Sequence, residues 1–379
     1  MKQLYLDNAA TAPVNPKAFA EYVRASVHYI GNPSSPHSEG HKARMALEGA
    51  REKIAQLLGC RRRKQIIFTS GGTESNNIAL YMPNRVGYEV ATSQIEHHSA
   101  TTGCVTIDSE GFIDERSFED SLCRTQIASI QYANADIGTI QDIKKLSQIC
   151  WDIHKGYGEF FTDAVQTVGH IPIDMKKLPH VCSLSASAHK FGGVKGTGFL
   201  YMREPMPTLK ESFHFIHGGN QEFGLRPGTE NVAGAIAMAK ALEDSLDNID
   251  YKIRRNRATQ KRLIEGLSLI PDSELNGATN LAKRLSNNVS FSFKGIYGDT
   301  LVALLDAQYG IIVSAGAACE SGNLDGNRIV KAIGKSEELA KGTIRITFDF
   351  NNGLTDEETD YVIDAITKSV KELRRKTRR

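Results

Sequence analysis

A carboxylate and a lysine follow two neighbouring apolar runs in the middle of the chain. Asp163 and Gln166 follow the run at 159–162, and Ser187-Ala-His-Lys190 follows the run at 181–184. If both runs are parallel strands, these groups meet at one sheet edge. An amine that can form a Schiff base and an anion that keeps a pyridine nitrogen protonated are what pyridoxal phosphate requires. A surface ion pair explains the same spacing equally well.

A second segment suits an anion. Ser70-Gly-Gly-Thr-Glu-Ser-Asn-Asn77 lies between an expected strand and an expected helix. Small residues let backbone N–H groups at a helix N-terminus approach a phosphate, and Thr73 adds a hydroxyl. An ordinary N-cap turn is the alternative. Neither this segment nor 192–198 matches the glycine motifs of dinucleotide or nucleoside-triphosphate sites, which argues against those ligands.

Two further positions could carry acid-base or nucleophilic chemistry. His97 and His98 follow a short strand near Val90, where a histidine is either structural or a proton carrier. Cys319 lies in the stretch 314–327, which has almost no bulky apolar anchor and is therefore expected to be a mobile loop. The other five cysteines are expected to be buried small hydrophobes. Cys319 is either a reactive thiol or an incidental surface one.

An arginine is placed on a strand with apolar neighbours. Ile344, Ile346 and Phe348 alternate and therefore share one strand face, so that Arg345 points to the other face. That face opens either into solvent or into a cleft.

The elements that would position these residues fall into two groups. From 15 to 250, strands near 65–69, 127–131, 159–162, 181–184 and 198–201 alternate with helices such as 43–58 and 142–154, which is typical of an α/β domain with a mostly parallel sheet. From 251 to 379 the pattern predicts a smaller α+β domain. Its last helix begins with a capping box, Thr355 to Glu358.

Composition bounds the remaining possibilities. The chain has 379 residues, 40% of them hydrophobic, and 46 Lys and Arg against 44 Asp and Glu give a net charge of +2. This balance argues against direct nucleic-acid binding. Because no stretch of eighteen apolar residues and no signal segment is found, we expect no membrane association and a cytoplasmic location. The six cysteines form no C-x-x-C pair, so no metal site is expected.

The order of these motifs resembles the cysteine desulfurases along almost the whole chain. The segments that carry the resemblance are Leu6-Asp-Asn-Ala-Ala-Thr11, Gly31-Asn-Pro-Ser-Ser35, Ser70 to Asn77, Glu96-His97, Asn134-Ala-Asp-Ile-Gly138, Asp163-Ala-Val-Gln166, Ser187-Ala-His-Lys190, Arg226-Pro-Gly-Thr229 and the Cys319 loop. The loop resembles the long-loop group that serves iron–sulfur cluster and thiolation pathways. The resemblance implies a pyridoxal-phosphate enzyme of fold type I, similar to class V aminotransferases, that acts as a homodimer. It also implies that the large domain, 15–250, holds the coenzyme and that both chain ends, 1–14 and 251–379, form the small domain.

The resemblance also implies residue roles. Lys190 would hold the coenzyme covalently, Asp163 would pair with its pyridine nitrogen, Gln166 would bond its ring hydroxyl, and His97 would stack on the ring and shuttle protons. Cys319, as a thiolate, would take sulfur from L-cysteine as a persulfide, leaving alanine, and pass it to an acceptor protein. The remaining expected contacts are Gly72, Thr73, Ser187, His189 and the partner subunit's Thr229 at the phosphate, Asn134 at coenzyme and substrate, and Asn32 and Arg345 at the substrate, with Arg345 on its carboxylate.

Some positions depart from the family pattern. The loop reads Ser314-Ala-Gly-Ala-Ala-Cys-Glu, which places Glu320 beside the thiol, where a carboxylate should raise the thiol pKa. The family's Asn-Asn-Glu-Ile-Gly appears here as Asn134-Ala-Asp-Ile-Gly138, which leaves the first Asn intact. The acceptor, either a cluster scaffold or a tRNA-thiolation enzyme, stays open. A selenocysteine lyase or aminotransferase of the same fold is the alternative, and it would retain activity without Cys319.

Overall fold

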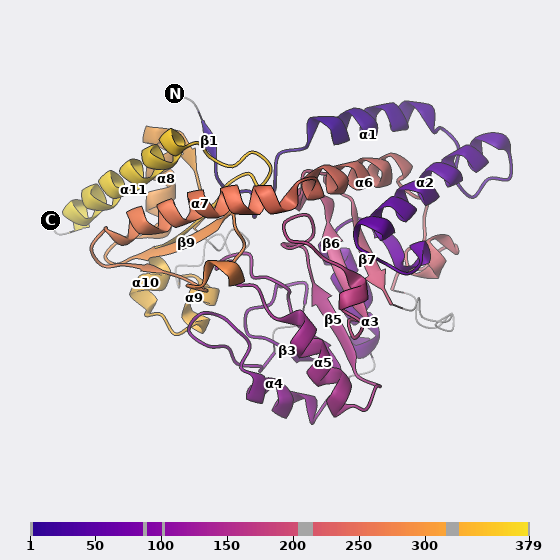
Figure 1. Cartoon of the computed structure of the whole chain (residues 1–379), viewed down its shortest axis with the longest axis horizontal. Coiled ribbons are helices and arrows are strands. Elements are labelled where there is room, and N and C mark those ends of the chain that lie inside the picture. Colours follow the sequence, from indigo (N-terminus) through magenta and orange to yellow (C-terminus); the bar gives the residue numbers. More distant parts are fainter. Residues whose placement is uncertain (1–2, 86–88, 101–102, 204–214, 316–325, 378–379) are drawn as a thin grey trace.

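The computed structural model describes residues 3–85, 89–100, 103–203, 215–315 and 326–377 (Figure 1). Its centre is a six-stranded sheet in the order β2-β7-β6-β5-β4-β3. Strands β3 to β6 pair in parallel, and β7 runs antiparallel to both β6 and β2. The prediction of an α/β fold with a mostly parallel sheet is therefore confirmed. The strands are β2 (Ile66–Thr69), β3 (Ala91–Thr92), β4 (Ile127–Ser129), β5 (Glu159–Asp163), β6 (Ser183–Ser187) and β7 (Gly198–Met202).

Helices flank this sheet, and their apolar faces build the larger hydrophobic cluster with it. The helices α1 and α2 pack on α6, and α4 packs on α5 (Figure 1). Their bounds are α1 (Pro16–His28), α2 (Ser38–Leu57), α3 (Gly72–Arg85), α4 (Glu115–Leu122), α5 (Ile143–Ile153) and α6 (Val232–Leu246).

Two predicted bounds were wrong. Helix α2 begins at Ser38, five residues before the expected start, because its first turn is polar and is capped by His37, whose Nδ1 accepts from the Gly40 N–H. Strand β6 was expected at 181–184 but runs from Ser183 to Ser187. Its three serines are buried in the sheet although serine is typical of loops.

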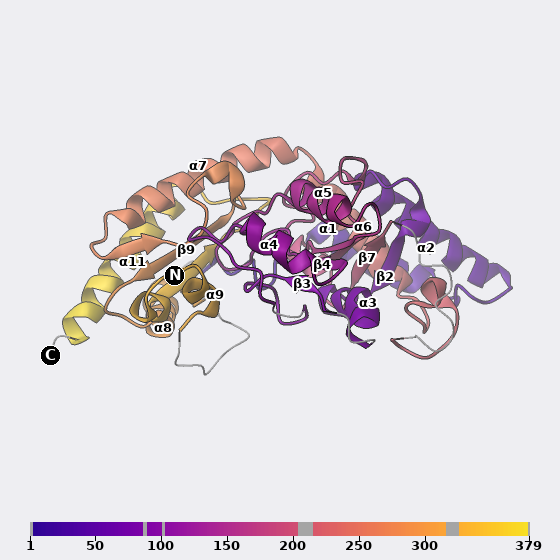
Figure 2. The same cartoon turned by 90° about the horizontal axis from the view of Figure 1, so that it is seen from below.

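The residues after 249 form a second unit, together with the N-terminus. Strand β1 (Leu4–Tyr5) pairs in parallel with β10 (Ile311–Ile312), and a three-stranded antiparallel sheet has the order β11-β9-β8. Figures 1 and 2 both show the N-terminus beside this unit. The other elements are α7 (Ile249–Ser268), β8 (Ser273–Leu275), β9 (Asn288–Phe293), α8 (Gly298–Tyr309), α9 (Arg328–Ala332), α10 (Glu337–Lys341), β11 (Thr343–Thr347) and α11 (Asp356–Thr377).

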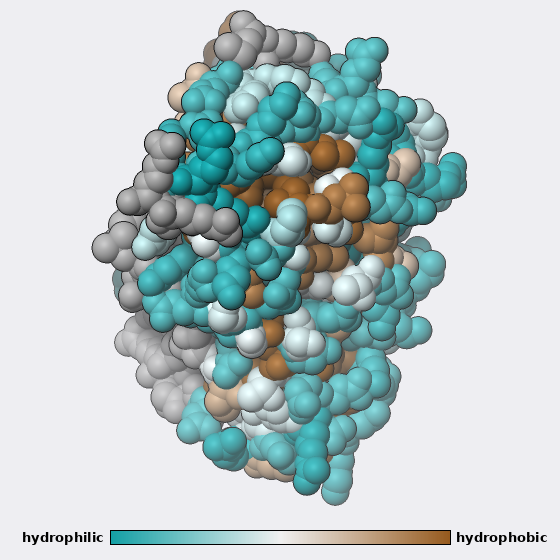
Figure 3. All heavy atoms as spheres, turned by 90° about the vertical axis from the view of Figure 1, so that its left-hand side faces the viewer, coloured by the Kyte–Doolittle hydropathy of each residue, from teal (hydrophilic) through white to brown (hydrophobic). Residues whose placement is uncertain are grey.

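A separate hydrophobic cluster fills this unit. It joins Leu4 and Leu6 to the inner faces of β9, β11, α7, α8 and α11. Figure 3 shows a band of apolar surface framed by hydrophilic residues at this end of the molecule. The predicted capping box is present, since the Thr355 hydroxyl accepts from the Glu358 N–H at 3.1 Å and the Glu358 carboxylate accepts from the Thr355 N–H at 3.0 Å. Two separate clusters support a division at residues 15 and 250, which stays a prediction.

Two statements about surfaces follow. Within the described ranges, no helix combines the length and apolarity needed to cross a membrane; the cytoplasmic location stays a prediction. The expectation that five cysteines are buried is wrong for Cys104 and Cys123, which are exposed. Cys150 is buried, and Cys60 and Cys182 are partly buried.

Candidate active site

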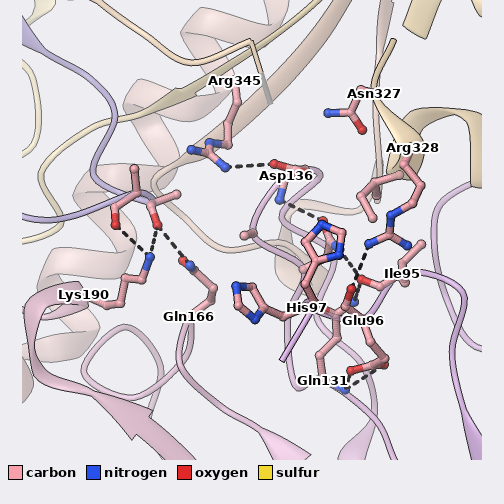
Figure 4. Close-up of a pocket in the computed structure, with 16 residues that line it drawn as sticks. Ile95, Glu96, His97, Gln131, Asp136, Gln166, Lys190, Asn327, Arg328 and Arg345 are labelled. Atoms are coloured by element: carbon pink, nitrogen blue, oxygen red, sulfur yellow. Dashed lines mark hydrogen bonds and ion pairs between the residues drawn. The ribbon is translucent and has the colours of Figure 1, made fainter. Parts of the chain in front are cut away.

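A cavity of about 220 Å³ opens where the carboxyl ends of the central strands meet the second unit (Figure 4). Five of the predicted site residues line it: His97, Asn134, Gln166, Lys190 and Arg345. The wall is completed by Ala9, Ala10, Ile95, Glu96, His98, Gln131, Ala135, Asp136, Asn327, Arg328 and Ile329. Parallel strands deliver their carboxyl ends to one edge, which is where ligands of such sheets bind.

Lys190 ends a short turn that directly follows β6. Its Nζ donates to the carbonyl oxygens of Ala9 at 2.6 Å and Ala10 at 2.8 Å, and Gln166 Nε2 donates to the same Ala9 carbonyl at 3.1 Å (Figure 4). The N-terminal motif 6–11 therefore forms the cavity wall beside the lysine. Its backbone oxygens hold the amine in place.

Asp163 ends β5 behind this wall. Its Oδ1 accepts from the Val165 N–H at 3.0 Å and its Oδ2 accepts from Asn76 Nδ2 at 2.7 Å. Asn76 Nδ2 also donates to Ser99 Oγ at 2.7 Å, and Ser99 Oγ lies 2.7 Å from His97 Nδ1. A chain of hydrogen bonds thus joins the carboxylate to the imidazole.

The electrostatics keep His97 neutral near pH 7. Burial lowers its pKa, the positive charge of Lys190 acts in the same direction, and Asp163 opposes both. A neutral imidazole can accept a proton, which a histidine in an acid-base role must do.

The turn that presents His97 is held on all sides. The carbonyl of Ile95 accepts from Gln131 Nε2 at 2.7 Å and from Asn134 Nδ2 at 3.1 Å. Arg328 reaches over from the second unit, and one of its Nη groups donates to the carbonyl of Glu96 at 2.9 Å (Figure 4). The other Nη group donates to the carbonyl of Gln94 at 2.5 Å.

Arg345 points into the cavity from β11, so the cleft alternative is the one the structure has. One edge of β11 pairs with β9 and the other is bridged at Ser314, which removes the strand edge from solvent. The Arg345 guanidinium bonds Asp7 Oδ1 at 2.7 Å and Asp136 Oδ1 at 2.8 Å.

The predicted phosphate residues lie beside the cavity rather than on its wall. Gly72 and Thr73 form the first turn of α3, and Ser187 ends β6. A Cβ at Gly72 would meet the Val165 side chain at 2.4 Å, so only glycine lets the helix start pack against the loop after Asp163. The carboxylate of Glu74, in the first turn of α3, accepts from the Ser70 N–H.

His189 is placed differently from a surface histidine. Its Nδ1 lies 3.1 Å from Thr11 Oγ1, and burial, followed by the charge of Lys190, lowers its pKa to about 4. His189 is therefore neutral at pH 7 and can donate or accept a hydrogen bond without carrying charge.

Two predicted residues, Asn32 and Thr229, are not brought to the cavity. Asn32 and Thr229 are partnered with each other, Asn32 Nδ2 donating to Thr229 Oγ1 at 3.4 Å, and neither lines the cavity. Cys319, with Glu320 beside it, lies outside the described residues.

The sequence interpretation gave no role to Asp7, Asp136 or Arg328. Asp136 stands two residues after Asn134, a predicted contact, so its place in that motif was an available signal. Asp7 stands in the motif 6–11, which was quoted for the resemblance without a role for any of its residues. Arg328 gave none, because nothing in the spacing shows that α9 reaches the 94–96 turn.

These residues fit pyridoxal phosphate. The cavity offers a primary amine at Lys190 and a neutral imidazole at His97. Behind its wall lies the Asp163 carboxylate, fixed by two donors, and beside it lies a helix N-terminus at Gly72 that favours an anion. Among the described residues no cluster of His, Cys, Asp and Glu could hold a metal ion.

Comparison with known proteins gives the same cofactor as the residues of the cavity do. The sequence pattern of the family described as Aminotransferase class-V matches residues 4–362. The chain is 39% identical to a cysteine desulfurase IscS of Dictyoglomus turgidum, over 98% of this chain and 96% of that protein, and 36% identical to a cysteine desulfurase IscS of Clostridium botulinum with the same coverage.

Solved structures give the same answer. The structure of a NifS-like protein covers 98% of this chain and 100% of its own, with a TM-score of 0.86 and 32% identity. The match extends through both units, so the fold is that of pyridoxal-phosphate enzymes of fold type I. The chain belongs to the class-V aminotransferase family and, within it, to the cysteine desulfurases, which are pyridoxal-phosphate-dependent enzymes.

Proposed function

We propose that this protein takes the sulfur of L-cysteine onto Cys319 as a persulfide, releases alanine, and hands the sulfur to an acceptor protein. The observation that carries the proposal is one cavity lined by a lysine, a neutral imidazole and an arginine, Lys190, His97 and Arg345, with Asp163 hydrogen-bonded behind it. In this cavity an amine can react at Lys190, a proton can be held at His97 and a carboxylate can be bound at Arg345.

When bound, pyridoxal phosphate supplies an electron sink for the α-carbon of the substrate. Lys190 would hold the coenzyme covalently, and the Asp163 carboxylate, fixed by Asn76 and the Val165 N–H, would keep a proton on the pyridine nitrogen. Gln166 would bond the ring hydroxyl. The phosphate would lie at the start of α3, at Gly72 and Thr73, with Ser187 and His189 beside it.

The substrate would be oriented from the opposite side. Arg345 would bind its carboxylate through two N–H groups, a geometry that the planar guanidinium favours. Asn134, which lines the cavity, would contact the remaining polar atoms of the substrate. His97, neutral because burial lowers its pKa, would accept and return protons at the reacting carbons.

The sulfur step assigned to Cys319 rests on the sequence alone. The Cys319 thiolate attacks the substrate sulfur, an S–S bond forms and the C–S bond breaks, and protonation of the carbon completes alanine. In net terms one L-cysteine and one thiol give one alanine and one persulfide, so no other oxidant or reductant is needed.

The decisive experiment measures alanine and enzyme-bound persulfide from L-cysteine for wild type, Lys190→Ala, Cys319→Ala and the matched control Cys123→Ala, which removes an exposed thiol elsewhere. Wild type and the control should form both products. Lys190→Ala should form neither, and Cys319→Ala should lose both, each by at least about a hundredfold. Full turnover by Cys319→Ala would favour the alternative, a selenocysteine lyase or aminotransferase.

We also propose that two copies form the working unit. One face of α1 carries Phe19, Val23 and Val27 at intervals of four residues, all exposed, and Ile30 continues the stripe just after the helix. An apolar stripe of this kind suits a second copy of the chain. Because Thr229 does not line its own cavity, a partner subunit's Thr229 at the phosphate is consistent with that arrangement.

The identity of the sulfur acceptor is proposed only as a class. An acceptor protein that presents a thiol can take the outer sulfur, so that its own persulfide forms and Cys319 returns to a thiol. A cluster scaffold and a tRNA-thiolation enzyme are the two candidate classes. Transfer of labelled sulfur from the loaded enzyme to purified candidates of each class would decide between them.

A further inference from the structure

Arg345 is clasped by two carboxylates before any substrate arrives. Its Nη2 bonds Asp7 at 2.7 Å and its Nη1 bonds Asp136 at 2.8 Å. The side chains of Arg345, Asp136 and Asp7 are 5%, 16% and 18% exposed, so all three charges are largely removed from water. Such pairs are strong because little solvent screens them.

With both carboxylates bound, the Arg345 guanidinium still has N–H groups that can donate, but its single positive charge is already balanced by two negative charges. A guanidinium has five N–H groups, and the Arg345 Nε–H is buried with no partner among the described residues. A substrate carboxylate can therefore find donors on Arg345. It would, however, be the third negative group around one positive group, and like charges at such distances repel strongly when they are buried.

The two carboxylates are not equivalent. Asp136 lines the cavity, whereas Asp7 does not. Asp7 is fixed in the N-terminal segment by a backbone bridge to Thr347. Asp136 stands on the turn 134–138, where Asn134 Oδ1 accepts from the Asp136 N–H at 2.8 Å and Asn288 Nδ2 donates to the Ala135 carbonyl at 3.0 Å. Of the two groups, only Asp136 is where an entering carboxylate would arrive.

The surroundings allow Asp136 to become neutral. Burial raises its pKa, which the positive charges of Arg345 and Arg328 oppose. Glu96 on the same wall adds little negative charge at pH 7, because burial raises its pKa to about 8. The charged and titratable groups that face this cavity are Glu96, His97, His98, Asp136, Lys190, Arg328 and Arg345, with Asp7 on the far side of Arg345.

We propose that Asp136 is the group that the substrate carboxylate replaces on Arg345, and that Asp136 takes up one proton from solvent as it is displaced. Asp7 keeps the guanidinium oriented throughout. Asp136 thereby weakens the binding of every carboxylate and makes it depend on pH. The inference rests on the proposed function only in taking the substrate to be a small amino acid.

The test uses the purified full-length enzyme with its coenzyme and sodium propionate as the probe, because propionate has a carboxylate but no amine or thiol. Calorimetric titrations at pH 7 in two buffers of different ionisation enthalpy give the affinity and the number of protons taken up. Wild type should take up a proton on binding. Asp136→Asn, which keeps the oxygen acceptor without the charge, should bind about tenfold more tightly and take up none.

Two matched variants separate displacement from simple positioning. Asp7→Asn removes the other carboxylate and should still take up a proton, and Asp136→Glu should restore both the weaker affinity and the uptake. The affinity of wild type should rise as pH falls, while that of Asp136→Asn should stay level. Thermal unfolding of each variant reports whether it is folded.

Three outcomes would overturn the inference. The first is proton uptake by Asp136→Asn equal to that of wild type. The second is a propionate affinity of folded Asp136→Asn no higher than that of wild type. The third is no propionate binding by wild type at all, since Arg345 would then take no carboxylate. The binding experiment does not measure alanine formation. Failure of the proposed function would therefore be seen in the alanine assay, and failure of this inference in the propionate titration.

Discussion

The carboxyl group of Glu96 is buried one residue before His97. It accepts from the Gln131 N–H at 3.1 and 2.9 Å and from Ser93 Oγ at 2.6 Å. Burial nevertheless raises its pKa to about 8, against the effect of these donors. A carboxyl group in this state is protonated at neutral pH, and it anchors the turn that carries His97 to the end of β4 without adding a charge to the cavity.

A stability prediction follows for Glu96. Its pKa is higher in the folded than in the unfolded protein, so its contribution to stability is fully present below about pH 4.5 and is lost as pH rises toward 8. The free energy of unfolding of wild type should therefore fall with pH relative to Glu96→Gln, by at most about 1.4 kcal/mol per pH unit in this window. Denaturant unfolding of both proteins from pH 5 to 9 measures the difference.

Stability curves for wild type and Glu96→Gln that run parallel from pH 5 to 9 would contradict a protonated Glu96. The exposed Glu115 of α4 provides a matched control, because Glu115→Gln removes a surface carboxylate and should leave the pH dependence as in wild type.

At the level of elements, α9 links the second unit to the His97 turn. Arg328, its first residue, bonds the carbonyls of Gln94 and Glu96, and Ile329 and Ile333 pack with Ile95 in a small cluster apart from the two main ones. The position of the His97 imidazole therefore depends on how the second unit is placed against the first.

We expect Arg328→Gln to lower kcat about tenfold with a smaller change in KM, because two carbonyls of the turn lose their donors and His97 loses its fixed position. The pKa of His97 should also rise, since the positive charge of Arg328 lowers it, and the acid limb of the pH–rate profile should move to higher pH. Nuclear magnetic resonance of labelled histidine measures this pKa independently of activity.

Lys331→Gln is the matched control for this variant. It removes a positive charge one turn further along α9, and no contact to the 94–96 turn is seen for it among the described residues. An effect of Lys331→Gln as large as that of Arg328→Gln would show that the charge of α9, rather than the two hydrogen bonds, matters.

Local patterns predicted much of this arrangement. Alternation placed Arg345 opposite Ile344 and Ile346, and the capping box at Thr355 marked the start of α11 correctly. Strand ends placed Asp163 and Lys190 at one sheet edge. Each of these is decided by residues that are neighbours in the sequence.

What spacing could not show is long-range partnership. Asp7 meets Arg345 across 338 residues, and Arg328 meets Gln94 across 234. The polar strand β6 was misplaced because its serines are buried by the tertiary structure rather than by their own character. Burial of Cys104 and Cys123 was expected from residue type alone, and the structure exposes both.

At the scale of the whole molecule, the exposed stripe on α1 has the character of an interface. Phe19, Val23 and Val27 on α1 are 52%, 47% and 76% exposed, and Ile30, just after the helix, is 77% exposed. Another face of α1 packs against α6. The homodimer proposed above would cover it.

If the proposed homodimer forms through α1, wild type should be a dimer at micromolar concentration and the double variant Val23→Asp/Val27→Asp should be a monomer, because two carboxylates would have to be buried in the interface without partners. Light scattering after size-exclusion chromatography measures the mass. If a partner subunit's Thr229 completes the phosphate site, the same variant should also bind the coenzyme at least about tenfold more weakly. Leu269→Asp, at an exposed apolar position in the other unit, should change neither property. A double variant that remains dimeric would show that α1 is not the interface. A monomeric wild type that holds its coenzyme fully would show that each cavity is complete within one chain.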